Sequence, residues 1–293
     1  MMRVAVIGTG VMGSAIARRL LATDTVVVVH NRTPARCAPL VAAGAHLAPS
    51  PADAAKGADH VVLSLNSADI VEQVVFGEGG VAHGAGGGAL LVDMSSIDPG
   101  GTAQFARRLR AERGVGWVDA PLSGGAPAAL RGELTLMLGG DAGDIARAEP
   151  LLSKLSARRT HFGPPGSGQT VKLVNQLLVA QAFLAVAEAT RFAESQGVDP
   201  ARIPAALAGG RADSRVLQEF MAKMGRRDYS PTGRLANMVK DLDAVERAAD
   251  AAGLGLRVTR LVNALHRRLV EAGHGEEDNA ALMRLFDLPD GPR

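Results

Sequence analysis

A glycine-rich turn near the start of the chain sets narrow limits on the fold. Its sequence is Gly8-Thr-Gly-Val-Met-Gly13, and it joins a short apolar run, residues 4–7, to an alanine-containing helical stretch. Between a strand and a helix, the first glycine permits a tight turn, the second lets a pyrophosphate approach the backbone, and the third allows close helix packing. The helix N-terminus adds positive partial charge. Glycines that serve only a turn are the alternative, but a turn alone does not need this strand and this helix. We therefore expect a dinucleotide to contact Gly8, Gly10, Val11, Met12 and Gly13.

Apolar runs and helical stretches alternate through the first half of the chain. The runs that predict strands are residues 4–7, 26–29, 61–65, 90–92, 116–119 and 135–139. Short runs rich in valine and leucine are typical of strands buried on both faces of a parallel sheet. The glycine-rich residues 77–88 predict a loop between elements.

The second half has a different pattern. After Gly163-Pro-Pro-Gly-Ser-Gly168, residues 169–196 contain no glycine or proline and predict a helix of about 42 Å. Apolar side chains surround most of its circumference, as in a helix buried between domains or at an interface. No strand pattern follows residue 200.

These patterns predict an α/β protein with two domains. Residues 1–164 would form a Rossmann domain with a doubly wound parallel sheet, which binds the dinucleotide. Residues 165–293 would form an all-α domain for the substrate and for oligomerisation, joined to the first by the long interdomain helix.

The residues after the second predicted strand favour NADP(H) as the cofactor. An acidic residue there would hydrogen-bond the ribose 2′-hydroxyl of NAD and repel a 2′-phosphate. The chain instead has Asn31, Arg32 and Thr33, with Arg36 one turn later, and these groups suit a phosphate. NAD(H) remains an alternative, in which Arg32 stacks on the adenine.

Composition excludes several other classes of function. The net charge is only +2 and the aromatic content is 3%, with Trp117 and Tyr229 the only tryptophan and tyrosine, so we expect no nucleic-acid partner. We expect no signal peptide, because the short apolar run after Arg3 enters the glycine motif rather than a small-residue cleavage site. We expect no membrane span, because the uncharged apolar stretch between Lys172 and Glu188 is shorter than the roughly 20 residues that a bilayer needs. The single cysteine, Cys37, fits a reducing cytoplasm. The histidines lack ligand spacing, so no metal is expected.

Five motifs, in this order along almost the whole chain, resemble the β-hydroxyacid dehydrogenase family. That family includes 3-hydroxyisobutyrate dehydrogenase, tartronate semialdehyde reductase and glyoxylate/succinic semialdehyde reductases. The motifs are Gly8-Thr-Gly-Val-Met-Gly13, Asp93-Met-Ser-Ser96, Asp119-Ala-Pro-Leu-Ser-Gly-Gly125, Gly166-Ser-Gly-Gln-Thr-Val-Lys172-Leu-Val-Asn175-Gln176 and Lys240-Asp-Leu242.

Lys172 is the candidate catalytic residue. Asn175 and Gln176 follow it at i+3 and i+4 and so project from the same side of the predicted helix, where they would contact the substrate. The resemblance implies that Lys172 is the general acid for carbonyl reduction and the general base for the reverse reaction. A lysine whose ammonium reaches the surface from the first helical turn is the structural alternative.

Ser123, Gly124 and Gly125 are the candidate carboxylate site. Successive backbone amides can bind a carboxylate, and the Ser123 hydroxyl adds a donor. The resemblance also assigns this segment to the substrate carboxylate, whereas in isolation it would be a plain turn.

The resemblance implies further contacts. It assigns Ser96 to the nicotinamide ribose, Lys240 to the cofactor, and Asp241 to the edge of the substrate site, although the last two could be an ordinary ion pair. Leu65-Asn66 stands where the family commonly has Leu-Pro, and we expect both residues near the cofactor. The resemblance also implies a homodimer or tetramer formed through the helical domain.

The sequence therefore predicts an NADP(H)-dependent oxidoreductase that transfers a hydride between the nicotinamide and a short β-hydroxy acid or its semialdehyde. An imine reductase on the same fold is one alternative, although imine-reducing relatives usually lack this lysine. A non-catalytic NADP-binding sensor is another. Dehydrogenation of 3-hydroxyacyl thioesters would need a catalytic histidine beside a glutamate, and a phosphogluconate-type decarboxylase would need a larger helical domain.

Overall fold

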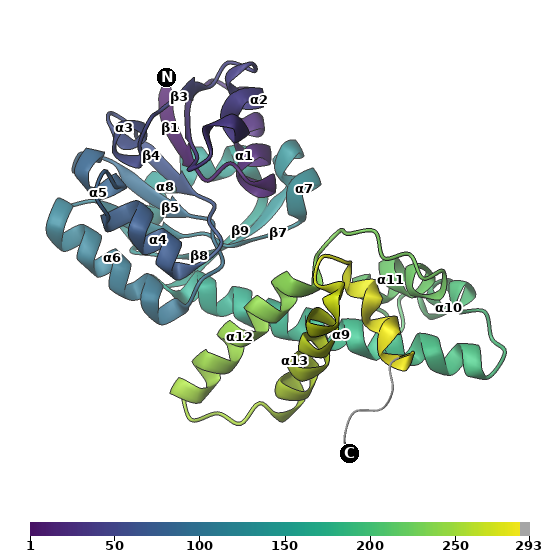
Figure 1. Cartoon of the computed structure of the whole chain (residues 1–293). Helices are drawn as coiled ribbons and strands as arrows, with labels where there is room; N and C mark the ends of the chain where they lie inside the picture. The colour runs from purple at the N-terminus through teal and green to yellow at the C-terminus, as the bar shows by residue number, and fades with distance from the viewer. Residues whose placement is uncertain (288–293) are drawn as a thin grey trace. The chain divides into compact units, whose positions relative to one another are not determined.

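The computed structural model describes residues 1–287 (Figure 1). It contains two compact units, Met1–Lys172 and a second that begins at Leu173. The domain boundary expected after residue 164 lies just before the long helix α9, Ser167–Ser195, whereas the two units divide within the first turns of that helix. Lys172 is therefore the last residue of the first unit.

The first unit is built on a nine-stranded sheet with the order β3-β2-β1-β4-β5-β6-β8-β7, and β9 pairs with β8. Strands β1 to β6 run parallel, β8 is antiparallel to β6 and β7, and β9 is parallel to β8. The Rossmann-type, mostly parallel sheet is confirmed. The strands are β1 Met2–Ile7, β2 Thr25–His30, β3 His46–Leu47, β4 His60–Leu63, β5 Leu90–Asp93, β6 Gly116–Asp119, β7 Leu122–Ser123, β8 Leu134–Gly139 and β9 Ser156–Gly163.

Both faces of the sheet are covered, because alternate residues of one strand enter different cores. In β1, Val4 and Val6 pack in one hydrophobic cluster, and Ala5 and Ile7 pack in the other. This is the period of two that a strand imposes on its side chains. The first cluster also contains residues of α1 Val11–Leu21, α2 Ala38–Val41, α7 Gly125–Arg131 and α8 Ala142–Leu155. The second contains residues of α3 Pro51–Ala55, α4 Ala68–Phe76, α5 Val81–Gly84 and α6 Pro99–Arg113.

Three strands and one helix were not expected from the sequence. Strand β3 has two exposed residues and β7 has two half-buried ones, so neither has an apolar run. Strand β9 is mostly exposed and contains Arg158, Arg159 and His161. The expected loop at residues 77–88 is wrong in part, because Val81 and Ala82 bury their side chains and form helix α5.

The second unit is helical, as expected. Its elements after α9 are a 3-10 turn Pro200–Arg202, α10 Ile203–Leu207, α11 Arg215–Gly225, α12 Leu235–Ala251, α13 Arg257–Leu269, a π-turn Val270–His274 and a 3-10 segment Asn279–Phe286. Its core packs Phe183 and Leu184 of α9 against Met221, Leu242 and Leu282. Up to residue 287, the extended pairing in this unit is an isolated bridge between Arg234 and Asp278.

Helix α9 is only partly buried. Ala180 and Ala187 are fully buried, whereas Leu178 and Phe192 are exposed. Among the described residues, α9 is the one helix long and apolar enough to cross a membrane by length and composition, and a third of its most apolar window is buried. A core helix passes the same test, so this is weak evidence, and the expected absence of a membrane span stays a prediction.

Candidate active site

The three glycines of the first turn have different surroundings. Gly8 has a φ of +92°, and a Cβ on it would collide with the carbonyl oxygen of Ser64. A Cβ on Gly13 would collide with the carbonyl oxygen of Gly8, so helix α1 packs directly on the turn. A Cβ on Gly10 would meet nothing within 4 Å. Close packing explains why positions 8 and 13 are glycine. Gly10 is exposed, and the space beside its backbone is free of protein atoms.

The start of helix α1 fits a phosphate. The first backbone N–H groups of any helix lack intrahelical acceptors. In α1 no side chain caps these groups, and the first turn contains no acidic residue. Gly10 and Val11 are exposed and Met12 is half-buried at this end. The donors and the open space beside Gly10 therefore suit a pyrophosphate, as the sequence predicts.

Asn31 connects this turn to the end of β2. Its side-chain Oδ1 accepts the Thr9 N–H at 3.1 Å, and its Nδ2 donates to the Thr33 carbonyl oxygen at 3.1 Å. The amide of Asn31 thus orders the loop itself. Arg32, Thr33 and Arg36 are exposed beside it.

The loops after β4 and β5 are joined by Ser95. Its hydroxyl oxygen accepts the Leu65 N–H at 3.0 Å, and its own N–H donates to Asp93 Oδ1 at 2.9 Å. Ser95 is buried, while the neighbouring Ser96 is half-buried and Asn66 is exposed. Strands β1, β2, β4 and β5 are parallel neighbours, so Leu65, Asn66 and Ser96 lie at the same sheet edge as the glycine turn.

Two buried carboxyl groups stand at the ends of β5 and β6. Burial raises the pKa of Asp93 to about 6, against hydrogen bonds from Ser95 that lower it. Burial also raises the pKa of Asp119, against backbone hydrogen bonds that lower it. The two residues pair in the register of β5 and β6, and the charge of Asp119 adds to the rise at Asp93.

Asp119 holds the start of α9. Its Oδ1 accepts the Gly166 N–H at 2.8 Å, and its Oδ2 accepts the Gln169 N–H at 3.0 Å. A carboxylate at a helix N-terminus satisfies free donors and interacts favourably with the helix dipole. The side chain of Gln169 extends the attachment, because Nε2 donates to the Ser95 carbonyl oxygen at 2.9 Å and Oε1 accepts the Ile97 N–H at 3.3 Å.

Lys172 lies one turn further along α9. Its Nζ donates to the carbonyl oxygen of Leu122 at 3.1 Å. Leu122 precedes Ser123 on β7, so the ammonium group is next to the predicted carboxylate segment. Gly124 and Gly125 have φ values of +119° and +66°, which favour glycine and turn the backbone into helix α7.

The helical unit brings the other predicted residues into one connected set. Asn175 Nδ2 donates to Gln176 Oε1 at 2.9 Å, and Gln176 Nε2 donates to Asp241 Oδ2 at 2.6 Å. Lys240 Nζ lies 3.2 Å from Asp241 Oδ1. Both carboxylate oxygens of Asp241 therefore have partners, and the bond to Gln176 connects α12 to α9.

The predicted residues thus fall into two groups. The first unit contains the glycine turn of residues 8–13, the loops after β2, β4 and β5, the segment that begins at Ser123, and Lys172. The helical unit contains Asn175, Gln176, Lys240 and Asp241. Helix α9 carries Lys172, Asn175 and Gln176 in succession. Sequence reasoning missed the roles of Asp119 and Gln169 in holding α9. Both belong to the quoted motifs, but a pattern of residue types does not show which side chains are buried and bonded.

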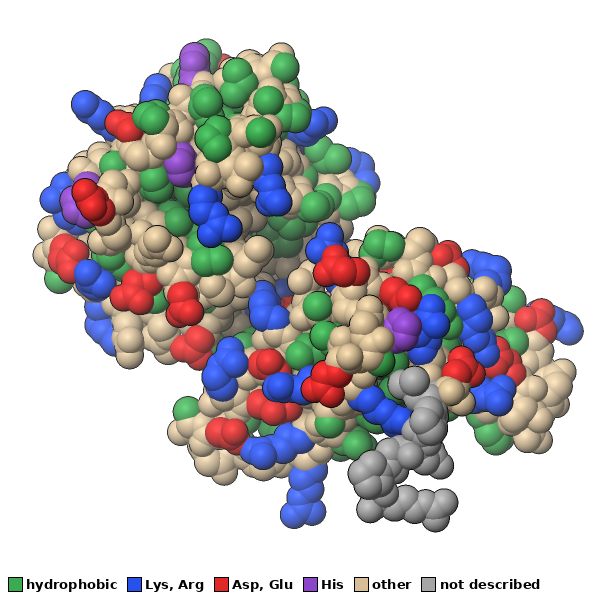
Figure 2. Space-filling view, in the orientation of Figure 1, with side chains coloured by type: hydrophobic (Ala, Val, Ile, Leu, Met, Phe, Trp, Pro, Cys, Tyr) green, Lys and Arg blue, Asp and Glu red, His purple; other side chains and the backbone are tan. Residues whose placement is uncertain are grey.

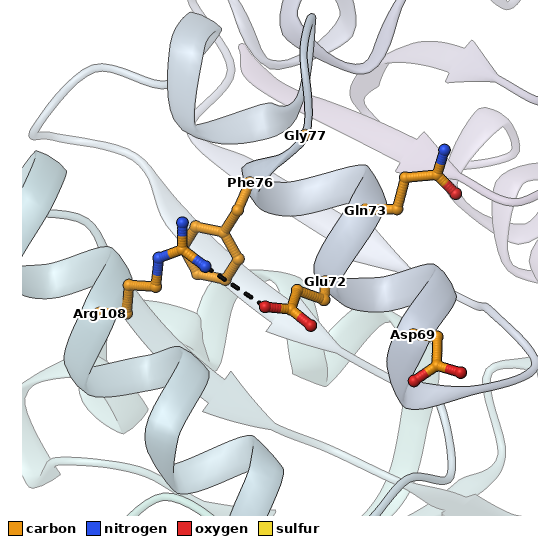
Figure 3. Close-up of a pocket in the computed structure, with 6 residues that line it drawn as sticks. All are labelled: Asp69, Glu72, Gln73, Phe76, Gly77 and Arg108. Atoms are coloured by element: carbon orange, nitrogen blue, oxygen red, sulfur yellow. Dashed lines mark hydrogen bonds and ion pairs between the residues drawn. The ribbon is translucent and has the colours of Figure 1, made fainter.

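A hollow on the surface of the first unit contains none of these residues. It is lined by Asp69, Glu72, Gln73, Phe76, Gly77 and Arg108 (Figure 3). The Arg108 guanidinium lies 4.1 Å from the Phe76 ring centre and 3.4 Å from Glu72. Helices α4 and α6 are joined there by an exposed ion pair, and nothing in the hollow resembles a second reaction site. Within residues 1–287, no three His, Cys, Asp or Glu side chains cluster to hold a metal ion, and the metal-free site stays a prediction.

Comparisons with known proteins identify both units. Residues 3–163 match the model described as the NAD binding domain of 6-phosphogluconate dehydrogenase. Residues 166–286 match the one described as NAD-binding of NADP-dependent 3-hydroxyisobutyrate dehydrogenase.

Similar proteins cover nearly the whole chain. The 2-hydroxy-3-oxopropionate reductase of Escherichia coli K12 is 34% identical over 98% of both chains. An NAD-dependent L-serine dehydrogenase of Pseudomonas aeruginosa is 33% identical over 99% of this chain and 100% of its own. The crystal structure of a 3-hydroxyisobutyrate dehydrogenase from Salmonella typhimurium has a TM-score of 0.86 at 30% identity and covers 98% of this chain and 100% of its own. The chain belongs to the β-hydroxyacid dehydrogenase family, NAD(P)-dependent oxidoreductases that act on short hydroxy acids.

Proposed function

We propose that the protein interconverts a short semialdehyde and its β-hydroxy acid with NADP(H), and that Lys172 is the general acid and base. One observation carries the proposal: Lys172 Nζ is held at 3.1 Å by the carbonyl oxygen of Leu122, immediately before Ser123. A proton donor and a segment suited to a carboxylate are therefore adjacent within one unit.

Different residues bind the substrate carboxylate and transfer the proton. When bound, the nicotinamide supplies or takes up the hydride. The Ser123 hydroxyl and the amides of Gly124 and Gly125 bind the substrate carboxylate. Lys172 donates a proton from Nζ to the carbonyl oxygen during reduction and accepts it from the alcohol during oxidation.

The helical unit contains the remaining candidate binding residues. Gln176 and Asp241 hold each other at 2.6 Å, and Asn175 is bonded to Gln176, so their polar groups are ordered before substrate arrives. We assign Asn175, Gln176 and Asp241 to substrate binding and Lys240 to the cofactor. Such a cluster of polar groups favours a small polar acid over an apolar one, because it can hydrogen-bond the first and offers little contact to the second.

The preference for NADP(H) rests on the end of β2. Asn31 orders the loop through its bonds to Thr9 and Thr33, which leaves Arg32, Thr33 and Arg36 exposed beside the nucleotide turn. A 2′-phosphate placed there would receive charge-assisted hydrogen bonds. No acidic residue follows the strand to repel it.

Turnover measurements test the substrate class. NADPH oxidation would be followed with glyoxylate, 2-hydroxy-3-oxopropionate, methylmalonate semialdehyde and succinate semialdehyde, with NADH in parallel. Two relatives are named as a 2-hydroxy-3-oxopropionate reductase and an L-serine dehydrogenase. Oxidation of L-serine with NADP⁺ and with NAD⁺ is therefore measured as well. Turnover of one compound with NADPH preferred is the expected result. Tight NADPH binding without any turnover would contradict the proposal and favour a sensor or an imine substrate.

Replacement of the lysine tests its role directly. Lys172→Ala should lower kcat by about 10²- to 10⁴-fold, because general acid catalysis contributes on this order. NADPH affinity, measured by nicotinamide fluorescence, should change little. Turnover at the wild-type rate would refute the assignment of Lys172.

We further propose that the protein is a cytoplasmic homo-oligomer, with a second copy covering the exposed apolar side chains of the helical unit. Its one cysteine, Cys37, is buried and unpaired, which suits a reducing compartment. Basic and acidic side chains are interspersed on the visible face (Figure 2), and the net charge of +2 gives no field for nucleic acid.

A further inference from the structure

The proposed reaction needs Lys172 and the cofactor loop to be held at a fixed separation. These groups come from different elements, since Lys172 is on α9 and the loop of residues 94–97 follows β5. A misplacement of about 1 Å can lower the rate of a reaction by 10²-fold. A rigid connection between helix and loop would therefore affect turnover without touching the substrate.

Gln169 provides such a connection. Its side chain is only 1% exposed, and both ends of its amide are bonded to the loop. Nε2 donates to the carbonyl oxygen of Ser95 at 2.9 Å, and Oε1 accepts the N–H of Ile97 at 3.3 Å. The two backbone groups flank Ser96, the residue assigned to the nicotinamide ribose.

The backbone of Gln169 is fixed as well. Its N–H donates to Asp119 Oδ2 at 3.0 Å, so the first turn of α9 is attached to the end of β6. Lys172 is three residues later and projects from the same side of the helix. One residue therefore joins β6, the loop with Ser96 and the helical turn with Lys172.

The chemistry of the position favours an amide. Ser95 presents a carbonyl acceptor and Ile97 presents an N–H donor, and either group would destabilise the loop if it were left buried without a partner. Glutamine carries one donor and one acceptor group at the end of its side chain, so it satisfies both. A methionine has a similar length and volume but has no donor for the Ser95 carbonyl oxygen and only a weak sulfur acceptor for the Ile97 N–H.

We propose that Gln169 is a positioning residue, which sets the distance between the Ser96 loop and Lys172 for hydride and proton transfer. This inference rests on the proposed function of Lys172. Gln169 itself touches neither the reacting atoms nor the substrate in this assignment. It acts through Ser96 and Lys172.

The test compares Gln169→Met with Gln181→Met, a matched control on the same helix. Gln181 is half-buried and bonds Thr259 at 3.3 Å in the helical unit, away from the loop. Circular dichroism first establishes that both variants fold. In the protein without cofactor, hydrogen exchange of peptides covering residues 94–98 should become at least tenfold faster in Gln169→Met and remain unchanged in Gln181→Met.

Kinetics then separate positioning from a purely structural role. Gln169→Met should lower kcat by about 10- to 100-fold, with the substrate KM within threefold, and raise the isotope effect from NADPH deuterated at the transferred position. In a Ser96→Ala background the same substitution should cost much less, because the loop no longer carries the ribose contact. Unchanged exchange at residues 94–98, or faster exchange with kcat and isotope effect unchanged, would overturn the inference.

The role of Gln169 can be tested even if the proposed function is wrong. If the wild type turned over no compound of the panel, hydrogen exchange of residues 94–98 with NADPH bound would decide whether Gln169 holds this loop. NADPH should then protect residues 94–98 in the wild type and protect them less in Gln169→Met. Equal protection in both proteins would reject the role of Gln169 on its own evidence.

Discussion

Asp93 shows how single residues at the sheet edge combine stability and site geometry. The carboxyl group is fully buried at the end of β5, Oδ1 accepts the Ser95 N–H, and Oδ2 has no hydrogen-bond partner among residues 1–287. A buried carboxylate with an unsatisfied oxygen is costly, so the neutral acid is favoured and the pKa rises to about 6. Asp93 therefore holds Ser95 in place, but its buried charge lowers the free energy of unfolding by an amount that depends on pH.

The stability of the protein should depend on pH through Asp93. Because the pKa of Asp93 is higher in the folded than in the unfolded chain, its stabilising contribution is complete below about pH 4 and is lost as the pH rises through about 6. A rise of about two units corresponds to about 3 kcal/mol. Asp93→Asn should therefore raise the free energy of unfolding at pH 8 and change it little at pH 4, measured by urea denaturation. The exposed Asp24→Asn serves as control, and an equal effect at both pH values would contradict the prediction.

The exposed arginines after β2 should determine the choice between NADPH and NADH. Arg32→Ala and Arg36→Ala should each weaken NADPH binding by about 10- to 100-fold, because a charge-assisted hydrogen bond contributes about 1.5–3 kcal/mol. NADH binding should change by less than threefold. Fluorescence titration with both nucleotides measures this. An equal loss for NADPH and NADH would indicate that the arginines contact a part common to both.

At the scale of elements, packing requires some of the glycines in the turn between β1 and α1 and leaves the space beside another one open. A Cβ on Gly13 would collide with the Gly8 carbonyl oxygen, and a Cβ on Gly10 would meet no protein atom within 4 Å. Within one motif, packing therefore requires glycine at Gly13 but does not require it at Gly10. The difference is testable by one methyl group.

Gly13→Ala should lower the melting temperature by several degrees, because α1 must move away from the turn and the core beneath it loosens. Gly10→Ala should leave the melting temperature of the protein without cofactor nearly unchanged and weaken NADPH binding at least tenfold, because the methyl group occupies the phosphate position. Thermal unfolding and fluorescence titration measure the two effects. A stability loss at Gly10 equal to that at Gly13 would contradict the assignment of the open space to a ligand.

At the scale of the whole molecule, the helical unit leaves large apolar side chains uncovered. Leu178 and Phe192 on α9 are 59% and 69% exposed, and Val258 and Leu261 on α13 are each 59% exposed. Helices α9 and α13 are joined through Gln181 and Thr259, so both rows belong to one unit. A second copy that covered these rows would remove the exposed apolar area.

Leu178→Glu and Leu261→Glu should therefore shift the protein toward smaller species, because a buried unpaired carboxylate opposes association. Light scattering after size-exclusion chromatography measures the mass. Gln196→Glu, at an exposed position just beyond α9, is the control. A wild type that is monomeric at micromolar concentration would refute the oligomer.

The sequence by itself determined the parts of this protein that depend on local pattern. Valine- and leucine-rich runs predicted β1, β2, β4 to β6 and β8, and the turn glycines predicted the nucleotide end, because both follow from the geometry of one element. The family followed from five motifs in order. Strands β3, β7 and β9 were missed, because they are short or exposed and have no apolar run.

Only the tertiary structure decided which polar groups hold the site together. Asp119 and Gln169 are ordinary members of their motifs, and their roles depend on backbone groups some 50 and 70 residues away. Asn31 is a candidate cofactor residue, and only the fold shows that its amide also bonds Thr9 and Thr33. A local pattern specifies where a strand ends or a helix begins. Hydrogen bonds between distant segments form only when the sheet brings those ends together, which is why this part of the site needed the fold.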